Sequence, residues 1–180
     1  MPNWCENELK IEGPKKELEK FIEGAKGKNE GILLDMNNFI PYPEEFRKQD
    51  EMAEEYKRKY EEVVIEMSNE ERREYLKRHD WMKDGYNSGG YDWCYENWGT
   101  KWNFCDTELI YDEDEMLFYT FNTAWSPPEP IIIKMGEMFP ELTFELRYFN
   151  CRRAFNGLLR IKKGEVVIDD CARYYGHRGG

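Results

Sequence analysis

The first strand-forming segment constrains the fold of this chain more than any other part of the sequence. Charged side chains at Glu6, Glu8, Lys10 and Glu12 alternate with less polar ones at Cys5, Asn7, Leu9 and Ile11. Successive side chains of a strand point to opposite faces of a sheet, so this alternation predicts a half-buried strand over residues 5–12. The rest of the chain must then cover one face of the sheet.

A helix is predicted directly after this strand. Gly13 and Pro14 turn the chain, and Pro is tolerated at a helix start because its missing N–H would be unpaired there. The apolar residues that follow are Leu18, Phe21, Ile22 and Ala25. Their spacing of i, i+3, i+4 and i+7 is typical of one buried helix face. The pattern therefore predicts a helix near residues 14–26.

The same two periodicities return in the second half of the chain. Alternation predicts strands over residues 105–111, 116–122 and 142–149. Helical spacing predicts a helix near 128–138, and Pro130 lies too deep for a helix capped by Ser126. This helix is therefore expected to begin about a turn later. Two short apolar runs between Gly157 and Asp169 predict a hairpin.

The order of these elements, with the middle of the chain set aside, is β–α–β–β–α–β followed by a hairpin. This is the order of the split βαβ, or ferredoxin-like, fold. The predicted fold class is therefore α+β. It comprises a ferredoxin-like split βαβ antiparallel sheet with two helices on one face, a helical insertion and a C-terminal β-hairpin.

The insertion is expected at about residues 43–103. Helical spacing runs from Pro43 to about Met67, and Ser68 to Glu71 matches a capping box that opens a second, charge-rich helix. The stretch 80–103 is rich in Gly and aromatic residues and is expected to form loops. The apolar stripe of these helices is narrow, which favours an appendage over an independent domain.

Length and composition fit a single domain over residues 1–180. The chain has 40% apolar residues, and no run approaches 18 of them, so no membrane-spanning helix is expected. The start of the chain lacks the basic and apolar regions of a secretion signal.

The acid loop at 112–115 has neither the spacing nor the glycine of an EF-hand loop, and we interpret it as a solvated turn.

The net charge of −11 is unevenly distributed along the sequence. Residues 146–180 carry eight Arg and Lys against three acids, a local charge of +5, which leaves −16 for the rest. An acidic body repels nucleic acid, so nucleic acid is an unlikely partner. The basic C-terminal part is suited to contact with a phosphate or an acidic partner.

The cysteines predict neither a disulfide framework nor a metal site. They are Cys5, Cys94, Cys105, Cys151 and Cys171. Their number is odd, their spacings are wide and no CxxC occurs, so free thiols are expected. The sequence also lacks a phosphate-binding GKS/T motif, so neither a cofactor nor a structural metal is expected.

The segment from Tyr91 to Asn103 concentrates aromatic residues, with three of the six Trp of the chain at positions 93, 98 and 102. An indole N–H needs a partner when it is buried. The segment therefore forms either a closed packing knot that pins the insertion to the sheet or an aromatic recognition surface. Because Trp98 and Trp102 are four apart, we expect their indoles on one side, close to Lys101 and Trp125.

Several blocks of the sequence together resemble one known family. They are MPNWCENELKIEG at the start, WGTKWN at 98–103, TAWSPPEPII at 123–132, FPELTFELRY at 139–148 and Phe155-Asn156-Gly157. The chain resembles the YubB-type ferredoxin-like-domain proteins of bacteriophages and plasmids. The resemblance implies a ferredoxin-like fold with a variable helical insertion and an accessory protein of a mobile element in the bacterial cytoplasm. It implies no activity for any residue.

The chain departs from this resemblance in one place. Members of the family often have an acidic residue shortly after the last core strand, near Asn150, whereas residues 149–153 of this chain are neutral to basic. Any site that uses that acid is altered in this protein.

A non-catalytic binding protein for a small polar, nucleotide-like ligand is the first functional hypothesis. Indoles and amides that converge can hold a nucleobase by stacking and edge hydrogen bonds, and Lys101 can meet a phosphate. The candidate ligand-binding residues are Trp4, Trp98, Thr100, Lys101, Trp102, Asn103, Asn122 and Trp125. The alternative interpretation is that these groups only fasten the insertion.

Three other functional classes are weighed against this hypothesis. A protein–protein interaction module, which modulates a host defence factor through its acidic surface, is the alternative. RNA binding would place Tyr119 and Phe121 as stacking aromatics on the open sheet face, although the acidic body opposes it. An enzyme is also less favoured than the two binding classes, because neither His79 nor His177 is accompanied by a nucleophile. No catalytic residue is therefore nominated.

Overall fold

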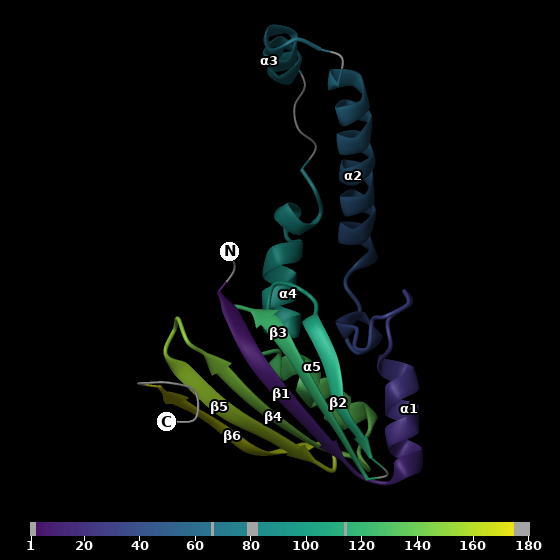
Figure 1. Cartoon of the computed structure of the whole chain (residues 1–180), viewed down its shortest axis with the longest axis vertical. Coiled ribbons are helices and arrows are strands. Elements are labelled where there is room, and N and C mark those ends of the chain that lie inside the picture. The colour runs from purple at the N-terminus through teal and green to yellow at the C-terminus, as the bar shows by residue number, and fades with distance from the viewer. Residues whose placement is uncertain (1–2, 66, 79–82, 114, 175–180) are drawn as a thin grey trace. The chain divides into compact units, whose positions relative to one another are not determined.

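The computed structural model describes residues 3–65, 67–78, 83–113 and 115–174 (Figure 1). The chain divides into two compact units. The first comprises residues 1–41 and 94–180, and the second comprises residues 42–93. A single domain with an insertion over 43–103 stays a prediction, and the second unit ends at Trp93.

A six-stranded antiparallel sheet in the order β2-β3-β1-β4-β5-β6 forms the base of the first unit. Its strands are β1 (Trp4–Glu12), β2 (Cys105–Glu113), β3 (Met116–Ala124), β4 (Thr143–Asn150), β5 (Phe155–Lys162) and β6 (Glu165–Arg173). Its main helices are α1 (Lys15–Ala25) and α5 (Glu129–Met138). The predicted α+β ferredoxin-like fold with a C-terminal hairpin is confirmed, because β1 to β4 have the split βαβ order.

The strand register places the alternating apolar residues on one face of the sheet. Leu9 pairs with Tyr119 on β3 and with Leu146 on β4, and all three side chains are buried. Phe21 of α1 packs against this face, with its ring 6.4 Å from Tyr119 and 5.6 Å from Phe144. The predicted alternation thus produces the core between the sheet and its helices.

Helix α5 covers the same face of the sheet and is drawn behind the strands in Figure 1. It begins at Glu129 after Pro128, which places Pro130 at the second position of the helix. The predicted late start is confirmed, since Pro is harmless within the first turn. Gly136 lies so close to β5 that a Cβ there would be 2.4 Å from Ile161 Cγ2.

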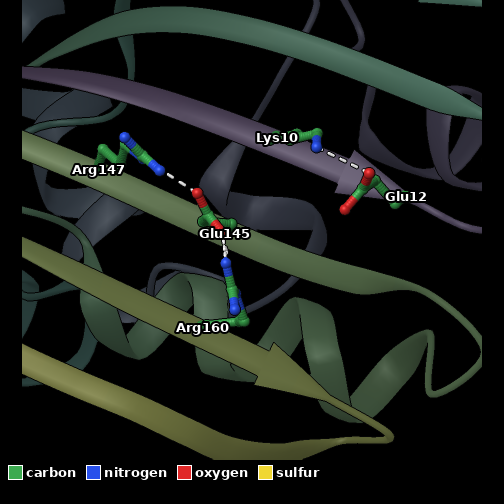
Figure 2. Close-up of polar contacts among 5 residues, drawn as sticks. All are labelled: Lys10, Glu12, Glu145, Arg147 and Arg160. Carbon is green, nitrogen blue, oxygen red and sulfur yellow. Dashed lines mark hydrogen bonds and ion pairs between the residues drawn. The ribbon is translucent and has the colours of Figure 1, made fainter.

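The opposite face of the sheet carries charged side chains. Glu145 on β4 accepts hydrogen bonds from Arg147 Nε at 2.9 Å and from Arg160 Nε at 2.8 Å (Figure 2). Lys10 and Glu12 form a further ion pair at 2.7 Å on β1. Figure 2 shows these side chains on the side of the strands that faces away from α5.

The second unit contains α2 (Glu44–Val64), α3 (Asn69–Arg78) and a short 3-10 turn at Tyr86–Ser88. The capping box is present, because Ser68 N and Oγ donate to Glu71 Oε2 at 2.8 and 2.7 Å. Within the described parts of the chain, no helix is long and apolar enough to cross a membrane.

The prediction of loops throughout residues 80–103 is wrong for α4 (Gly90–Trp98), while residues 79–82 lie outside the described residues. The glycines misled the prediction because they lie at the ends of this helix rather than inside it. Gly89 precedes α4, and Gly99 follows it with a positive φ of 75°, the conformation that ends many helices. A second short 3-10 helix, Met36–Asn38, belongs to the first unit.

All five cysteines are free thiols in the structure. Burial raises the pKa of Cys5 to about 12, so this thiol is unreactive at neutral pH. Among the residues that the structure describes, no group of three or more His, Cys, Asp and Glu side chains is arranged to hold a metal ion.

Candidate functional site

A cluster of aromatic and cationic side chains lies where β1 begins and β3 ends. Lys101 Nζ is 4.1 Å from the centre of the Trp125 ring and 4.9 Å from that of Trp102. Arg153 Cζ is 5.2 Å from the centre of the Trp125 ring. Trp102 meets Trp4 edge to face at 6.1 Å. These five residues are the cation–aromatic cluster, and both cations are within the range of attraction to an indole face.

Trp125 has an unusual backbone conformation for a residue with a side chain. Its φ is 80°, in the left-handed region that costs a non-glycine residue about 1–3 kcal/mol. The Trp125 N–H donates to Asn3 O at 2.8 Å, and the Trp125 carbonyl accepts from Asn150 Nδ2 at 3.0 Å. The strained conformation is therefore fixed by hydrogen bonds on both sides of the residue.

The buried polar side chains of the described residues all form hydrogen bonds that hold the chain around Trp125 in place. They are Asn7, Thr100, Thr123 and Asn150. Thr100 Oγ1 donates to Ala124 O at 2.8 Å, and Thr123 Oγ1 donates to Ser126 O at 2.8 Å. Asn7 Nδ2 donates to Thr123 Oγ1 at 2.9 Å. Buried polar groups are tolerated when they are paired, and here they hold the residues on either side of Trp125 in place.

Asn150 links the two sides of the cluster. While its Nδ2 donates to the Trp125 carbonyl, its Oδ1 accepts from the Arg153 backbone N–H at 3.0 Å. A single buried amide therefore positions the end of β3 and the turn between β4 and β5. The acidic residue that the family resemblance suggests near this position would lack the amide donor.

The Trp-rich block, residues 98–103, is attached to the connection between β3 and α5. Ser126 Oγ donates to Gly99 O at 2.6 Å. Gly99 combines a φ of 75° with a close approach, because a Cβ there would be 2.7 Å from Pro130 Cδ. The lone glycine between Trp98 and Trp102 is thus required by conformation and by space.

Three of the candidate residues have structural hydrogen bonds. Trp98 is 5% exposed and donates its Nε1–H to Ile40 O at 2.8 Å. Thr100 is fully buried on the Ala124 carbonyl. Asn103 accepts from Met36 N at 3.0 Å and donates to Asp35 Oδ1 at 2.8 Å. All of these contacts are made within the first unit, so these three side chains pack the segment against other parts of that unit.

The other candidate residues lie at the surface. Trp102 is 39% exposed, and with Lys101, Trp125 and Trp4 it forms most of the cation–aromatic cluster. Asn122 donates to Asp106 Oδ2 at 3.1 Å next to this cluster. Trp98 and Trp102 differ in exposure because the chain changes direction at Gly99. Residues 98–103 therefore contain both buried, hydrogen-bonded side chains and exposed ones.

Sequence reasoning missed Arg153 and Asn150 as members of the site. The basic run Arg152-Arg153 was a signal, because the C-terminal part was expected to suit a phosphate. Which cation reaches Trp125 depends on the fold of the turn after Asn150, which the sequence pattern does not define. The positions of Tyr119 and Phe121 also differ from those that RNA binding would need. Tyr119 and Phe121 are 1% and 3% exposed on the helix-covered face, so they offer no stacking surface on the open face.

A second group of titratable side chains lies between α5 and the sheet. Burial raises the pKa of Glu129, although a hydrogen bond from Tyr148 opposes the shift. Burial and the nearby Glu129 raise the pKa of the Tyr148 phenol well above its usual value. Tyr148 lies over Gly157, where a Cβ would be 2.2 Å from its Cζ. The pair therefore functions as a packed hydrogen-bonded contact at neutral pH.

The geometry defines a ferredoxin-like domain with a preorganised cation–aromatic surface, and comparisons with known proteins agree on the fold. Residues 97–175 match the model of a family described as "Ferredoxin-like domain in Api92-like protein". This segment is less than half of the chain, so the match shows what the segment is similar to. No curated protein sequence matches the chain.

A solved structure shares this fold. The crystal structure of the protein api92 from Yersinia pseudotuberculosis superposes with a TM-score of 0.56 at 11% identity, covering 99% of this chain and 100% of that one. At this identity the likeness shows the fold alone. The ferredoxin-like part of the sequence resemblance is thereby confirmed, and the YubB-type assignment stays a prediction.

Proposed function

We propose that this chain is a non-catalytic binding protein for a small nucleotide-like ligand, with the cation–aromatic cluster as its site. Lys101 and Arg153 contact the phosphate, and the exposed ring of Trp102 stacks on the base. In keeping with the family resemblance, the proposal includes an accessory role for a bacteriophage or plasmid in the bacterial cytoplasm.

The observation that carries this proposal is the support of Trp125. A strained backbone conformation is retained in a protein when the surrounding structure enforces it, and such strain is concentrated at functional sites. Here the buried polar side chains of the described residues fix the segment of an indole that two cations approach. Binding sites need this rigidity, because a preorganised site loses less entropy on binding.

The charge distribution supports an anionic ligand. The chain carries a net charge of −11, yet two cations are close to one ring in this cluster. Cations over an indole remain partly desolvated and retain hydrogen-bond donors that can reach an oxyanion. A ligand phosphate bridging Lys101 and Arg153 offsets their mutual repulsion, so a phosphate is favoured over a neutral ligand.

Isothermal titration calorimetry of the full chain with guanosine, adenosine, cytidine and uridine 5′-monophosphates tests this function. We expect saturable one-site binding of at least one nucleotide. Lys101→Gln and Arg153→Gln should each weaken that binding by about tenfold or more, as expected for a lost charge-assisted hydrogen bond.

Lys162→Gln is the matched control for these variants. Lys162 is exposed on β5 and pairs with Thr143 at the opposite end of the sheet. It removes the same charge from the chain without touching the cluster. Failure of all four nucleotides to bind, or equal weakening by Lys162→Gln, would show that the cluster is only a packing feature.

A protein-interaction module is the second candidate function, supported by helix α2 and the residue that follows it. Three large apolar side chains are exposed there among many acids, namely Met52, Val63 and Ile65. Exposed apolar side chains on an acidic helix suit a partner with apolar and basic groups. Replacing all three by Gln should abolish co-purification of a host partner while leaving nucleotide binding unchanged. A partner that still co-purifies with this variant contradicts the second candidate.

A further inference from the structure

Strand β6 forms an edge of the sheet to which no further described strand is paired. It is the last strand in the order β2-β3-β1-β4-β5-β6 and lies at the outside of the sheet in Figure 1. Backbone N–H and C=O groups along such an edge can pair with another strand. An added strand would extend the sheet beyond β6.

Of the two edges of the sheet, β6 is the more regular. From Ile168 to Arg173 it pairs residue by residue with β5, and its register shift lies before Ile168. The other edge, β2, has register shifts after Cys105 and after Leu109. Bulges of this kind twist an edge strand and discourage the addition of another strand. The segment that begins at Ile168 is therefore the edge best suited to a partner strand.

This edge carries opposite charges that have no partner within the described part of the chain. Asp169 pairs with the buried Leu159 of β5, so Asp169 and Arg173 belong to the face that α5 covers. Both are exposed, and neither is in an ion pair with a described residue. Burial and the nearby Asp169 raise the pKa of Glu129 on α5, so two acids adjoin each other here without a cation.

The charges limit which strand can be added. Charged side chains on an edge strand oppose pairing with most other strands. They favour a strand that places the opposite charge directly across from each of them, because cross-strand pairs of opposite charge are stabilising. The suitable partner has a cation opposite Asp169 and an acid opposite Arg173.

A second copy of β6, running antiparallel, has this pattern. When Cys171 lies opposite the partner's Cys171, Asp169 lies opposite the partner's Arg173. The two-fold symmetry of such a pair repeats the ion pair on the other side of the axis. Asp170 then lies opposite the partner's Ala172, so this register places no like charges across from each other.

The neighbouring registers are less favourable. Longer overlaps centred on Asp170 or on Asp169 place two identical carboxylates opposite each other, which is destabilising. A register centred between two residues would join the helix-covered face of one copy to the open face of the other. The charges and the faces of the sheet therefore favour the register centred on Cys171.

We infer that a second copy of this chain binds along β6, antiparallel and centred on Cys171, to form one continuous sheet. Ion pairs between Asp169 and the partner's Arg173 fix the register. Because the contact is confined to a short strand segment, the interface is small, and we expect a dissociation constant in the micromolar range. None of these residues belongs to the cation–aromatic cluster, so the inference does not depend on the proposed function.

Sedimentation velocity of the full chain over a range of concentrations tests this inference. The chain should show a monomer–dimer equilibrium. Arg173→Asp places an acid opposite Asp169 on both sides of the axis and should weaken association by about tenfold or more. Asp169→Arg should do the same. The double variant Asp169→Arg/Arg173→Asp exchanges the charges and should restore association to within about threefold of the unmodified chain.

Lys163→Asp is the matched control for Arg173→Asp, because it changes the charge by the same amount. Lys163 is exposed in the turn between β5 and β6, outside the paired segment. Its replacement should leave association unchanged. Melting curves of every variant verify that the fold is retained.

Disulfide formation tests the register independently. Directly opposed Cβ atoms in an antiparallel pair are about 4.5–5.5 Å apart, close to the separation that a disulfide needs. Diamide, which accepts the two electrons and two protons released by a pair of thiols, should therefore yield a covalent dimer. Cys171→Ser should abolish this dimer, whereas Cys151→Ser, which removes the other exposed thiol, should not.

Three results would overturn the inference. One is a chain that stays monomeric at every concentration, since an edge that binds only other proteins gives that result. Another is a dimer that neither Arg173→Asp nor Asp169→Arg weakens, which would place the contact on a different surface. The third is a covalent dimer that survives Cys171→Ser, which would exclude the register centred on this residue.

Discussion

Trp125 combines an unusual backbone angle with contacts to several side chains. Its φ of 80° would be easy for glycine, yet an indole occupies the position and two cations approach its ring. Asn150 and Asn3 bind its carbonyl and N–H. The residues that serve the site and those that stabilise the fold are therefore different members of the same short segments.

Trp98 and Trp102 should respond very differently to truncation. Trp98→Ala removes a buried indole that is hydrogen-bonded to Ile40 O, so it should lower the free energy of unfolding by about 3–5 kcal/mol. Trp102→Ala removes a side chain that is 39% exposed and should cost about 1 kcal/mol or less. Urea denaturation measures both. Equal losses would place Trp102 in the packing knot.

Two glycines should respond to alanine with opposite signs. Gly157→Ala puts a Cβ 2.2 Å from the Tyr148 ring, so it should lower stability by about 1–3 kcal/mol. Gly24→Ala, inside α1, meets only Phe139 Cζ at 3.6 Å and should raise stability by about 0.5–1 kcal/mol. Thermal melting of both variants tests the packing of Tyr148. A neutral Gly157→Ala would show that this ring lies elsewhere.

At the scale of elements, sequence periodicity was sufficient to predict a helix or strand wherever one face of that element is buried. The alternation in residues 5–12 predicted β1 to within one residue, and Pro130 predicted the late start of α5. Helix α4 was missed because its glycines lie at its ends. The turn after Asn150, which brings Arg153 to Trp125, is also hidden from the sequence pattern.

The contact between α5 and the sheet should depend on pH through Glu129. Burial raises its pKa, so the folded chain binds more protons than the unfolded chain. The free energy of unfolding should then fall as pH rises from about 4, the ordinary value for Glu, through the raised pKa. Glu129→Gln should remove this loss and increase stability at pH 7. Urea denaturation between pH 3 and 8 measures the effect.

Glu145 supplies the control with the opposite sign. Burial tends to raise its pKa, but Arg160 and Arg147 outweigh burial and lower it. The stability that the ionised Glu145 carboxylate contributes should be present at neutral pH and should be lost as pH falls through the lowered pKa. Glu145→Gln should therefore reduce stability at pH 7 (Figure 2). If both variants shift stability in the same direction, the assignment of Glu129 is wrong.

At the scale of the whole molecule, the two units differ in how much core each possesses. The first unit has a six-stranded sheet with two helices packed on one face. In the described part of residues 42–93, Val64 is the one buried apolar side chain, and it is still 7% exposed. The isolated 42–93 fragment is therefore expected to be largely unfolded, since so little apolar burial cannot offset chain entropy. A cooperative melting transition of this fragment would contradict that expectation.

Excision of the second unit should leave the first unit folded and able to bind its ligand. Ile40 O accepts from Trp98 Nε1 at 2.8 Å, and Cys94 is one helical turn before Trp98, so the two ends of the first unit are close together. A Gly/Ser linker of about eight residues can join Pro41 to Cys94. The excised chain should melt cooperatively and bind nucleotides within about threefold of the full chain, because the cation–aromatic cluster belongs to the first unit. Loss of binding in a chain that still melts cooperatively would show that residues 42–93 contribute to the site.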